Sequence, residues 1–212
     1  TQGPSFDSRE ITAKQGKRAT FGVSAPSSGG FTDVAEDVVF VDQDDDKTSN
    51  YRGWFDGQLN TENNGGRAEI SFDVPSSAPI QSHGFSLLTR HEGSPQAYMS
   101  TVDINVRGTP NISVSTNSIT TSTEEGQVAN REFTITNNGS ASLSWSLTSN
   151  SDWLPADTSA TLSPGNSTSL SLTIGSEVLG AGTYDGQLSI SSNDEDKTPV
   201  TVSVTHTVNR VP

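Results

Sequence analysis

Arg131-Glu-Phe-Thr-Ile-Thr-Asn137 alternates apolar and polar residues strictly, and Asn138-Gly139 follows at once. Alternation with a period of two places Phe133 and Ile135 on the same face of a half-buried β-strand. Asn-Gly is a preferred pair for a tight turn between two strands. The stretch therefore predicts a strand that ends in a turn, which is the repeating element of an antiparallel sheet.

The same alternation recurs through the second half of the chain. If the short Trp153-Leu154 segment counts as a strand, about seven strands follow one another at 8–12-residue spacing, which is typical of a Greek-key sandwich. Trp145 and Trp153 are then packing residues. The expected inward-facing sets are Leu143, Trp145 and Leu147; Leu170, Leu172 and Ile174; Tyr184, Leu188 and Ile190; and Val200, Val202, Val204 and Val208.

The first half of the chain shows the same period with longer polar interruptions. A polar insertion separates Asp42 from Gly66, and the two halves meet at Arg107-Gly-Thr-Pro110, which is too short for a flexible tether. We therefore expect an all-β chain of two tandem immunoglobulin-like β-sandwich domains, residues 1–108 and 109–212, which fold independently and form a stiff rod. The alternating sets are Ala19, Phe21, Val23 and Ala25; Ala68, Ile70, Phe72 and Val74; Phe85, Leu87 and Leu88; and Val102, Ile104 and Val106, with an apolar run at Val38–Val41.

Composition excludes several classes of protein. The chain of 212 residues has no cysteine, which rules out disulfides and thiolate metal sites. A formal net charge of −13 argues against binding nucleic acid, and no apolar run is long enough for membrane insertion. Because Thr1 is no initiator residue, we expect a secreted protein, extracellular or at a cell surface, whose signal peptide is removed, or a fragment of a larger secreted protein.

Residues 110–208 resemble the BACON-like, immunoglobulin-like repeats of bacterial secreted and surface proteins. The likeness rests on the order of Phe133 to Gly139, Leu143-Ser-Trp145, Trp153-Leu154, Leu162 to Leu170, and Gly180 to Asp194. The resemblance implies a module that binds carbohydrate or acts as a spacer, and it implies that Asp194-Glu-Asp196 is a plain connector. The first domain resembles immunoglobulin-like stalk domains only in general terms.

An acidic run follows the strand expected at Val38–Val41. Asp42, Asp44 and Asp46 supply carboxylate oxygens at alternate positions, and such oxygens suit calcium. The run is not an EF-hand, because Lys47 and Gly53 stand where that loop needs glycine and glutamate. Two interpretations stay open, a solvated acidic turn and a calcium site of another geometry, and calcium is the one cofactor that we consider.

Aromatic residues gather in the same insertion. Tyr51, Trp54 and Phe55 lie in an expected loop, where they could stack on sugar rings, anchor a protein partner or cap the open end of the sandwich. His83, His91 and His206 share no metal-ligand spacing, and no strained nucleophile motif is present. We therefore predict no catalytic residue and no enzymatic activity.

The N-terminal arm, Thr1 to Glu10, has one large apolar residue, Phe6. Such an arm could add to an exposed edge strand of a neighbouring subunit, with Phe6 and Ile11 as anchors, and so propagate a filament. The alternative is a remnant of a linker. For the whole chain we predict a non-catalytic extracellular structural or interaction protein, a rod-like building block of a surface fibre, stalk or adhesin. Its partners would be itself, other surface proteins or polysaccharide. The alternative is a carbohydrate-targeting accessory module of a secreted hydrolase or protease.

Overall fold

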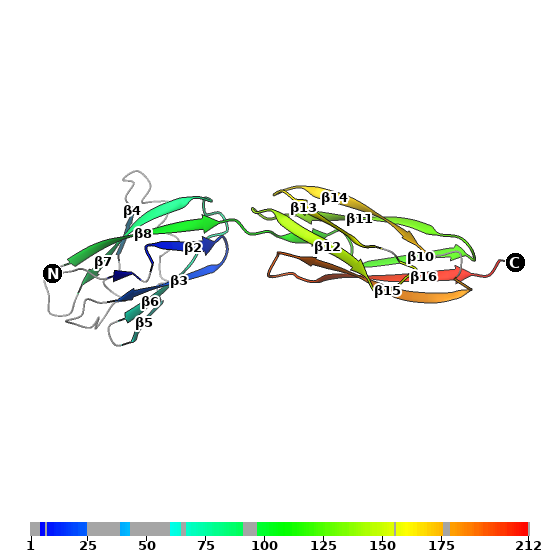
Figure 1. Ribbon diagram of the computed structural model, residues 1–212, viewed down its shortest axis with the longest axis horizontal. Coiled ribbons are helices and arrows are strands. Elements are labelled where there is room, and N and C mark those ends of the chain that lie inside the picture. The colour runs from blue at the N-terminus through cyan, green and yellow to red at the C-terminus, as the bar shows by residue number, and fades with distance from the viewer. Residues whose placement is uncertain are drawn as a thin grey trace. The chain divides into compact units, whose positions relative to one another are not determined.

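The computed structural model describes residues 5–6, 8–24, 39–42, 60–64, 67–90, 97–154, 156–175 and 179–211. Every secondary-structure element among them is a β-strand, as expected for an all-β chain. The chain divides into two compact units, Thr1–Gly108 and Thr109–Pro212 (Figure 1). That each unit folds without the other stays a prediction.

The first unit contains two four-stranded sheets (Figure 1). The first two strands of the chain belong to different sheets: β1 pairs antiparallel with β3 in one sheet, and β2 pairs parallel with β8 in the other. The first sheet is β1 (Ser5–Phe6), β3 (Arg18–Ser24), β6 (Arg67–Asp73) and β5 (Asn60–Asn64), and the second is β2 (Glu10–Lys14), β8 (Ala97–Arg107), β7 (Ser82–Arg90) and β4 (Val39–Asp42).

The core of the first unit follows the alternation of its strands. Phe21 of β3 and Phe72 of β6 meet edge to face with ring centroids 6.3 Å apart, a favourable arrangement of two aromatic quadrupoles. Their neighbours come from both sheets, so the core lies between the sheets. The buried apolar residues are Ile11, Ala13, Ala19, Phe21, Val23, Ile70, Phe72, Val74, Ala78, Val102, Ile104 and Val106.

Two segments of the first unit form strands that the sequence pattern did not indicate. The segment 60–64 lies inside the polar insertion between residues 42 and 66, yet it forms β5, which pairs with β6. The N-terminal arm also contains strand, since Ser5 pairs with Ser24 and Phe6 with Val23. Ile11 begins the buried face of β2 and is only 8% exposed, so it belongs to the core of its own unit.

The second unit also consists of two sheets (Figure 1). Its first two strands are again divided between the sheets: β9 pairs antiparallel with β11, and β10 pairs parallel with the last strand, β16. The smaller sheet is β14 (Ser167–Ile174), β11 (Ala129–Asn137) and β9 (Ile112–Val114), and the larger is β10 (Ser118–Glu124), β16 (Val200–Asn209), β15 (Gly182–Ser192), β12 (Leu143–Ser149) and β13 (Thr158–Leu162). Two packed, mainly antiparallel sheets in this order confirm the immunoglobulin-like sandwich.

The core of the second unit contains most of the predicted inward residues, whereas Leu170, Tyr184 and Val200 are only half-buried. Trp145 is 4% exposed and Trp153 packs against the same core, so both are packing residues. The segment Trp153-Leu154 is a turn, not a strand, although Leu154 is fully buried. The strand in this part of the chain is β13, in which only Leu162 is buried. The buried cluster is Ile112, Ile119, Phe133, Ile135, Leu143, Trp145, Leu147, Leu154, Leu162, Leu172, Ile174, Leu188, Ile190, Val202 and Val204.

Two buried polar side chains, Asn137 and Asp194, form hydrogen bonds with the backbone at the start of the second unit. Asn137 is completely buried; its Nδ2 donates to the carbonyls of Ala141 (2.8 Å) and Leu162 (3.0 Å). Its Oδ1 accepts from the backbone N–H groups of Asn111 (3.3 Å) and Gly139 (3.0 Å). All four hydrogen bonds that an amide side chain makes most readily are therefore present, as burial requires.

Asp194 acts in the same region from the opposite sheet. It is 3% exposed, and its two carboxylate oxygens accept from the N–H groups of Ile112 (2.9 Å) and Asp196 (3.0 Å). The first bond ties the loop before β16 to β9. A charged acceptor strengthens such a bond relative to a neutral one, so Asp194 fixes the entry of the chain.

Candidate functional site

Most of the residues predicted to bind a ligand lie outside the described residues. These are Asp44, Asp46, Tyr51, Trp54 and Phe55. Asp42 is the last residue of β4 and pairs with Phe85 of β7. Among the described residues no group of three or more His, Cys, Asp or Glu side chains is placed to hold a metal. Calcium binding and sugar stacking in the insertion stay predictions.

The acidic turn Asp194-Glu-Asp196 has a structural role at its first residue. Both carboxylate oxygens of Asp194 are occupied by backbone N–H groups, which agrees with a connector. The N-terminal arm is described in part: Phe6 lies in β1, paired within its own unit, and Ile11 is buried. For the arm to pair with a neighbouring subunit, β1 would first have to leave β3 of its own unit. Pairing of the arm between subunits stays a prediction.

A histidine and two aromatic residues meet near the end of β16. The ring of His206, which is fully buried, stacks on that of Trp153 with centroids 6.0 Å apart, and Tyr184 lies 6.3 Å from Trp153. The Tyr184 hydroxyl donates to the carbonyl of Gly180 at 2.8 Å, the arrangement known as a tyrosine corner. The contacts close one end of the core.

His206 is neutral in this environment. Burial lowers the pKa of His206 below its ordinary value of 6.5, and the backbone of Thr121 opposes this only in part. Nε2 lies 3.3 Å from Thr123 Oγ1, whereas Nδ1 and the buried Thr121 Oγ1 have no hydrogen-bond partner. Trp153 and Thr123, which lie at the ring, carry no charge, so burial remains the larger effect on the pKa of His206.

We expect the second unit to lose stability as the pH falls from 7.5 to 5.5. At pH values between the lowered pKa of folded His206 and 6.5, the unfolded chain binds more protons than the folded chain. The free energy of unfolding therefore decreases as the pH falls. Thermal unfolding followed by tryptophan fluorescence measures the effect. In His206→Gln the slope should flatten, while His83→Gln in the first unit should keep it. An unchanged slope in His206→Gln would contradict this assignment.

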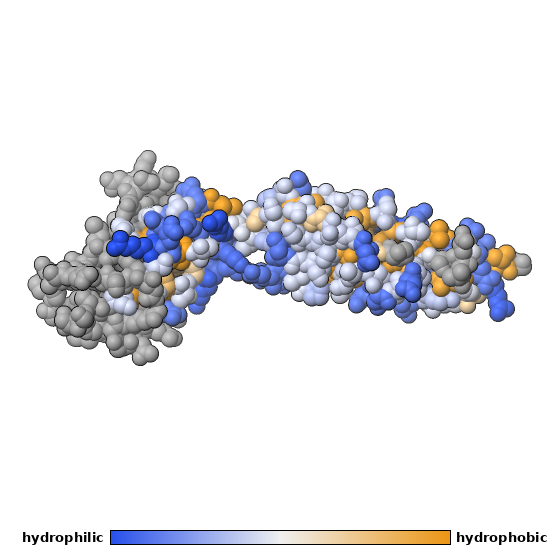
Figure 2. Space-filling model, viewed as in Figure 1, coloured by the Kyte–Doolittle hydropathy of each residue, from blue (hydrophilic) through white to orange (hydrophobic). Residues whose placement is uncertain are grey.

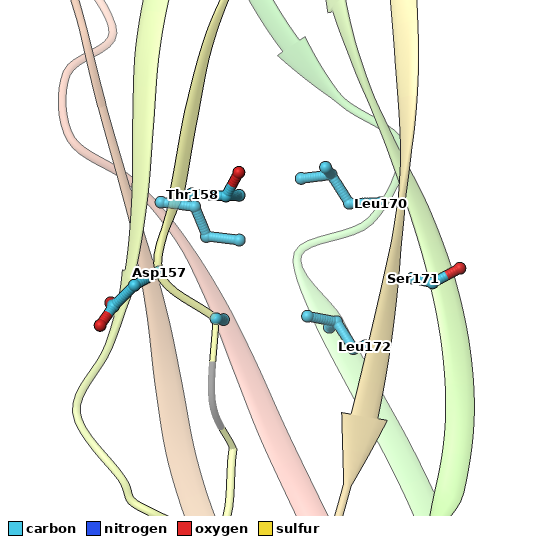
Figure 3. Close-up of a pocket in the computed structure, with 7 residues that line it drawn as sticks. Asp157, Thr158, Leu170, Ser171 and Leu172 are labelled. Atoms are coloured by element: carbon cyan, nitrogen blue, oxygen red, sulfur yellow. The ribbon is translucent and has the colours of Figure 1, made fainter.

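A cavity of about 540 Å³ opens between β13 and β14. Leu170 and Leu172 project into it and face Thr158 across the gap, whereas Ser171 and the carboxylate of Asp157 point away (Figure 3). Leu147 and Ala156 complete the lining. Sequence analysis missed this site, because residues 158–161 have no apolar alternation that would place β13 beside it.

The outer face of the smaller sheet is a ladder of small polar residues. Cross-strand side-chain bonds join Thr136 to Ser167 at 2.9 Å and Thr134 to Ser169 at 3.3 Å. Ser171 donates to Glu132 at 3.0 Å, and Thr173 donates to Asn130 at 3.2 Å. Such pairs each add a little to sheet stability. Figure 2 shows pale, weakly polar residues over much of the visible surface of this unit.

No described residue lies in a helix, and so none lies in a helix long and apolar enough to cross a bilayer. Residues 111–205 match the family model described as a viral BACON domain, which confirms the BACON-like resemblance of the second unit. No curated protein matches the chain.

Several solved structures are similar to this chain at low sequence identity. A protein of unknown function from Porphyromonas gingivalis W83 is 13% identical, with 97% of this chain and 100% of that chain covered and a TM-score of 0.43. The fibronectin(III)-like modules of Clostridium thermocellum CbhA are 11% identical, with 98% and 94% covered and a TM-score of 0.31. PapD-like domain 7 of human CEP192 is 14% identical over 48% of this chain and 87% of its own, with a TM-score of 0.40.

Proposed function

We propose that this chain, whose residues 111–205 form a BACON-like domain, is a non-catalytic structural module that carries tension along a surface fibre, stalk or adhesin. A BACON-like domain beside an immunoglobulin-like sandwich fits a structural or carbohydrate-associated module. The observation that carries the tension-bearing role is the parallel pairing of the first long strand with the last strand in each unit.

Parallel pairing decides how a pulling force acts on the hydrogen bonds. In the second unit β10 and β16 run side by side from Ser118↔Ser203 to Glu124↔Asn209. Tension that enters before β10 and leaves after β16 draws the two strands past each other in opposite directions. All bonds of the ladder then bear the load together, so the unit has to break them at once.

The first unit has the same arrangement on a shorter ladder. β2 and β8 are in register from Glu10↔Asp103 to Lys14↔Arg107, five pairs against the seven of β10 and β16. In the second unit Asn137 and Asp194 also anchor the chain before it reaches β10, through the N–H groups of Asn111 and Ile112. The second unit should therefore resist tension better than the first.

The setting of this role is outside the cytoplasm. Because the chain has no cysteine, its stability outside a cell depends on its apolar cores, and the described part of each unit contains a set of buried apolar residues. The description of the matching family as viral adds the surface of a virus particle to the surface of a cell as a place for such a fibre. Carbohydrate targeting by the insertion with Tyr51, Trp54 and Phe55 is the second candidate.

Single-molecule stretching of the full chain, held at its two ends, tests the proposal. Cysteines added at the ends give unique attachment points, since the chain has none of its own. We expect two unfolding events, with the event of the second unit at the higher force. Two events at forces no larger than those needed to peel a hairpin apart would refute a tension-bearing role.

A pair of proline variants provides the matched control. The bonds Ser203 N–H to Asn117 O and Glu125 N–H to Asn209 O show that the odd-numbered residues of this strand point their backbone groups at β16. Thr123→Pro should therefore lower the unfolding force of the second unit. Ser122→Pro removes an N–H that points away from β16, and it should leave that force nearly unchanged.

A further inference from the structure

One side of the second unit lacks the protection that other sheet edges in this chain have. Within the described residues, each of the four sheets ends in two edge strands. β1 and β9 are short, at two and three residues, and charged residues occur in β2, β4, β5 and β10, namely Glu10, Lys14, Asp42, Glu62 and Glu124. Short length and charge are the usual means of preventing an edge from pairing with another strand.

The edges β13 and β14 are neither short nor charged. β14 has eight residues, Ser-Thr-Ser-Leu-Ser-Leu-Thr-Ile, and β13 has five, Thr-Ser-Ala-Thr-Leu. Neither contains proline, glycine or an ionisable side chain. Among the described edge strands these two alone combine useful length with neutrality, and they border the same cavity. An edge of this composition is a template for an additional strand.

The hydrogen-bond pattern identifies the backbone groups that such a strand would meet. Asn137 N–H donates to Asn166 O, so within this antiparallel pair Phe133↔Leu170 and Arg131↔Leu172 are the bonded pairs. The alternate residues, Ser167, Ser169, Ser171 and Thr173, point their N–H and C=O groups outward. The side-chain bonds across the ladder occur at these same residues, as expected for closely spaced non-bonded pairs.

The cavity lies on the inward side of this edge. Leu172 is 3% exposed, whereas Leu170 is only half-buried, so the apolar face of β14 is incompletely covered. Thr158, opposite Leu170 in Figure 3, belongs to β13 and is exposed. A strand added to β14 directs every second side chain inward. One of these side chains would enter the cavity beside Leu170.

Two observations indicate whether the added strand comes from a second copy of this chain or from another protein. A second copy of this chain could offer its own β14, but the leucines of that strand already pack in their own core, so they cannot fill this cavity. Each copy also carries a formal net charge of −13, so two copies repel each other. Charge therefore favours a neutral or basic partner over a second copy.

We propose that the β14 edge of the second unit is a docking site for an extended segment of another protein, neutral or basic, that adds as a strand and inserts one apolar side chain beside Leu170. The main-chain bonds to Ser167, Ser169, Ser171 and Thr173 supply affinity, and the cavity supplies specificity. This docking is independent of the tension-bearing role, because β14 is not in the sheet that contains β10 and β16.

Amide hydrogen exchange on the full chain tests the docking. The probe is the peptide Lys-Thr-Val-Thr-Phe-Thr-Val-Thr-Lys, blocked at both ends, at saturating concentration. We expect exchange at Ser167, Ser169, Ser171 and Thr173 to slow by about tenfold or more, because their N–H groups gain acceptors. Unchanged exchange at these four amides would overturn the proposal, and so would protection confined to Ser159 and Thr161, the outward residues of β13.

Matched variants locate the binding edge. Ser169→Pro removes an outward N–H without breaking a bond to β11, and it should weaken peptide binding about tenfold, or about 1.4 kcal/mol. Ser159→Pro does the same on β13 and should have no effect on binding. Leu170→Lys places a charge at the cavity and should weaken binding as well. If Ser169→Pro does not fold, the exchange pattern of the unchanged chain still decides.

Two further outcomes distinguish the partner. A peptide with glutamate in place of both lysines should bind more weakly at low salt, and equal binding would contradict the preference for a neutral or basic partner over an acidic one. Sedimentation of the chain without peptide should show no association through this edge. A dimer whose formation protects the same four amides would assign the edge to a second copy and overturn the proposal.

Discussion

Substitution of Gly139 by alanine should lower the free energy of unfolding of the second unit by about 3–5 kcal/mol, at the upper end of the range for a single change. A Cβ at this position would lie 2.2 Å from Thr109 O, 2.5 Å from Asn111 N and 2.7 Å from Pro110 C. All three are backbone atoms, so no side-chain rotation relieves the overlap. The segment 109–111 would have to move away.

The cost is large because that segment is hydrogen-bonded at the same place. Thr109 O accepts from the N–H groups of Ser140 (2.8 Å) and Ala141 (3.2 Å), and its own N–H donates to Ser140 Oγ. Moving the segment breaks these bonds together with the one between Asn138 N–H and Asn111 O. Bonds broken in this half-buried segment leave polar groups without protein partners, which adds to the cost of the overlap.

Denaturant unfolding of the full chain, followed by the fluorescence of Trp145 and Trp153, measures this effect. Gly180→Ala is the matched control, since a Cβ there meets nothing within 4 Å, and it should leave the midpoint nearly unchanged. A loss below about 1 kcal/mol in Gly139→Ala, in the ordinary range for surface changes, would show that the close approach is not maintained in solution.

Substitution of Asn137 by alanine should cost about 3 kcal/mol of unfolding free energy in the second unit. The change removes a buried side chain that serves two carbonyls and two N–H groups, and each buried group left without a partner costs about 1–3 kcal/mol. Relaxation and entry of water reduce the sum. The same fluorescence measurement applies, and the N–H groups of Asn111 and Gly139 should exchange faster.

The adjacent residue offers the control. Asn138 is exposed and takes part only through its backbone N–H, so Asn138→Ala should be nearly neutral. If Asn137→Ala and Asn138→Ala were equally mild, the hydrogen bonds of Asn137 would not contribute to stability. If both were severe, the turn itself would be responsible.

Strands with alternating apolar residues could be predicted from the sequence, but strands without them could not. Alternating apolar residues predict a strand face that is buried. The structure buries Phe133, Ile135, Val202 and Val204 as this pattern predicts. In β13 the residues before Leu162 are all exposed, and in β10 the buried residues are Ile119 and a threonine, Thr121. These segments are strands because β12 and β16 offer unpaired backbone groups beside them.

The pair Trp153-Leu154 shows the converse error. Two adjacent large apolar residues suggested a strand, yet a turn buries Leu154 completely and stacks Trp153 on His206. Burial requires only that a side chain reach the core, and a turn over the end of a sandwich does so as well as a strand. The sequence spacing between residues 153 and 206 contains no sign of this contact.

Local pattern alone determined that this chain is all-β and immunoglobulin-like, because a period of two and turn residues are properties of neighbouring positions. Gly139 belongs to a predicted turn, but its lack of a Cβ is needed for the approach of residues 109–111, nearly thirty positions away. The sequence of Ser167–Ile174 likewise does not reveal the proposed docking edge at β14, since any strand has two edges until its neighbours are placed. Only the pairing of all strands decides which edge stays open, because hydrogen bonds between strands join residues that are distant in the chain.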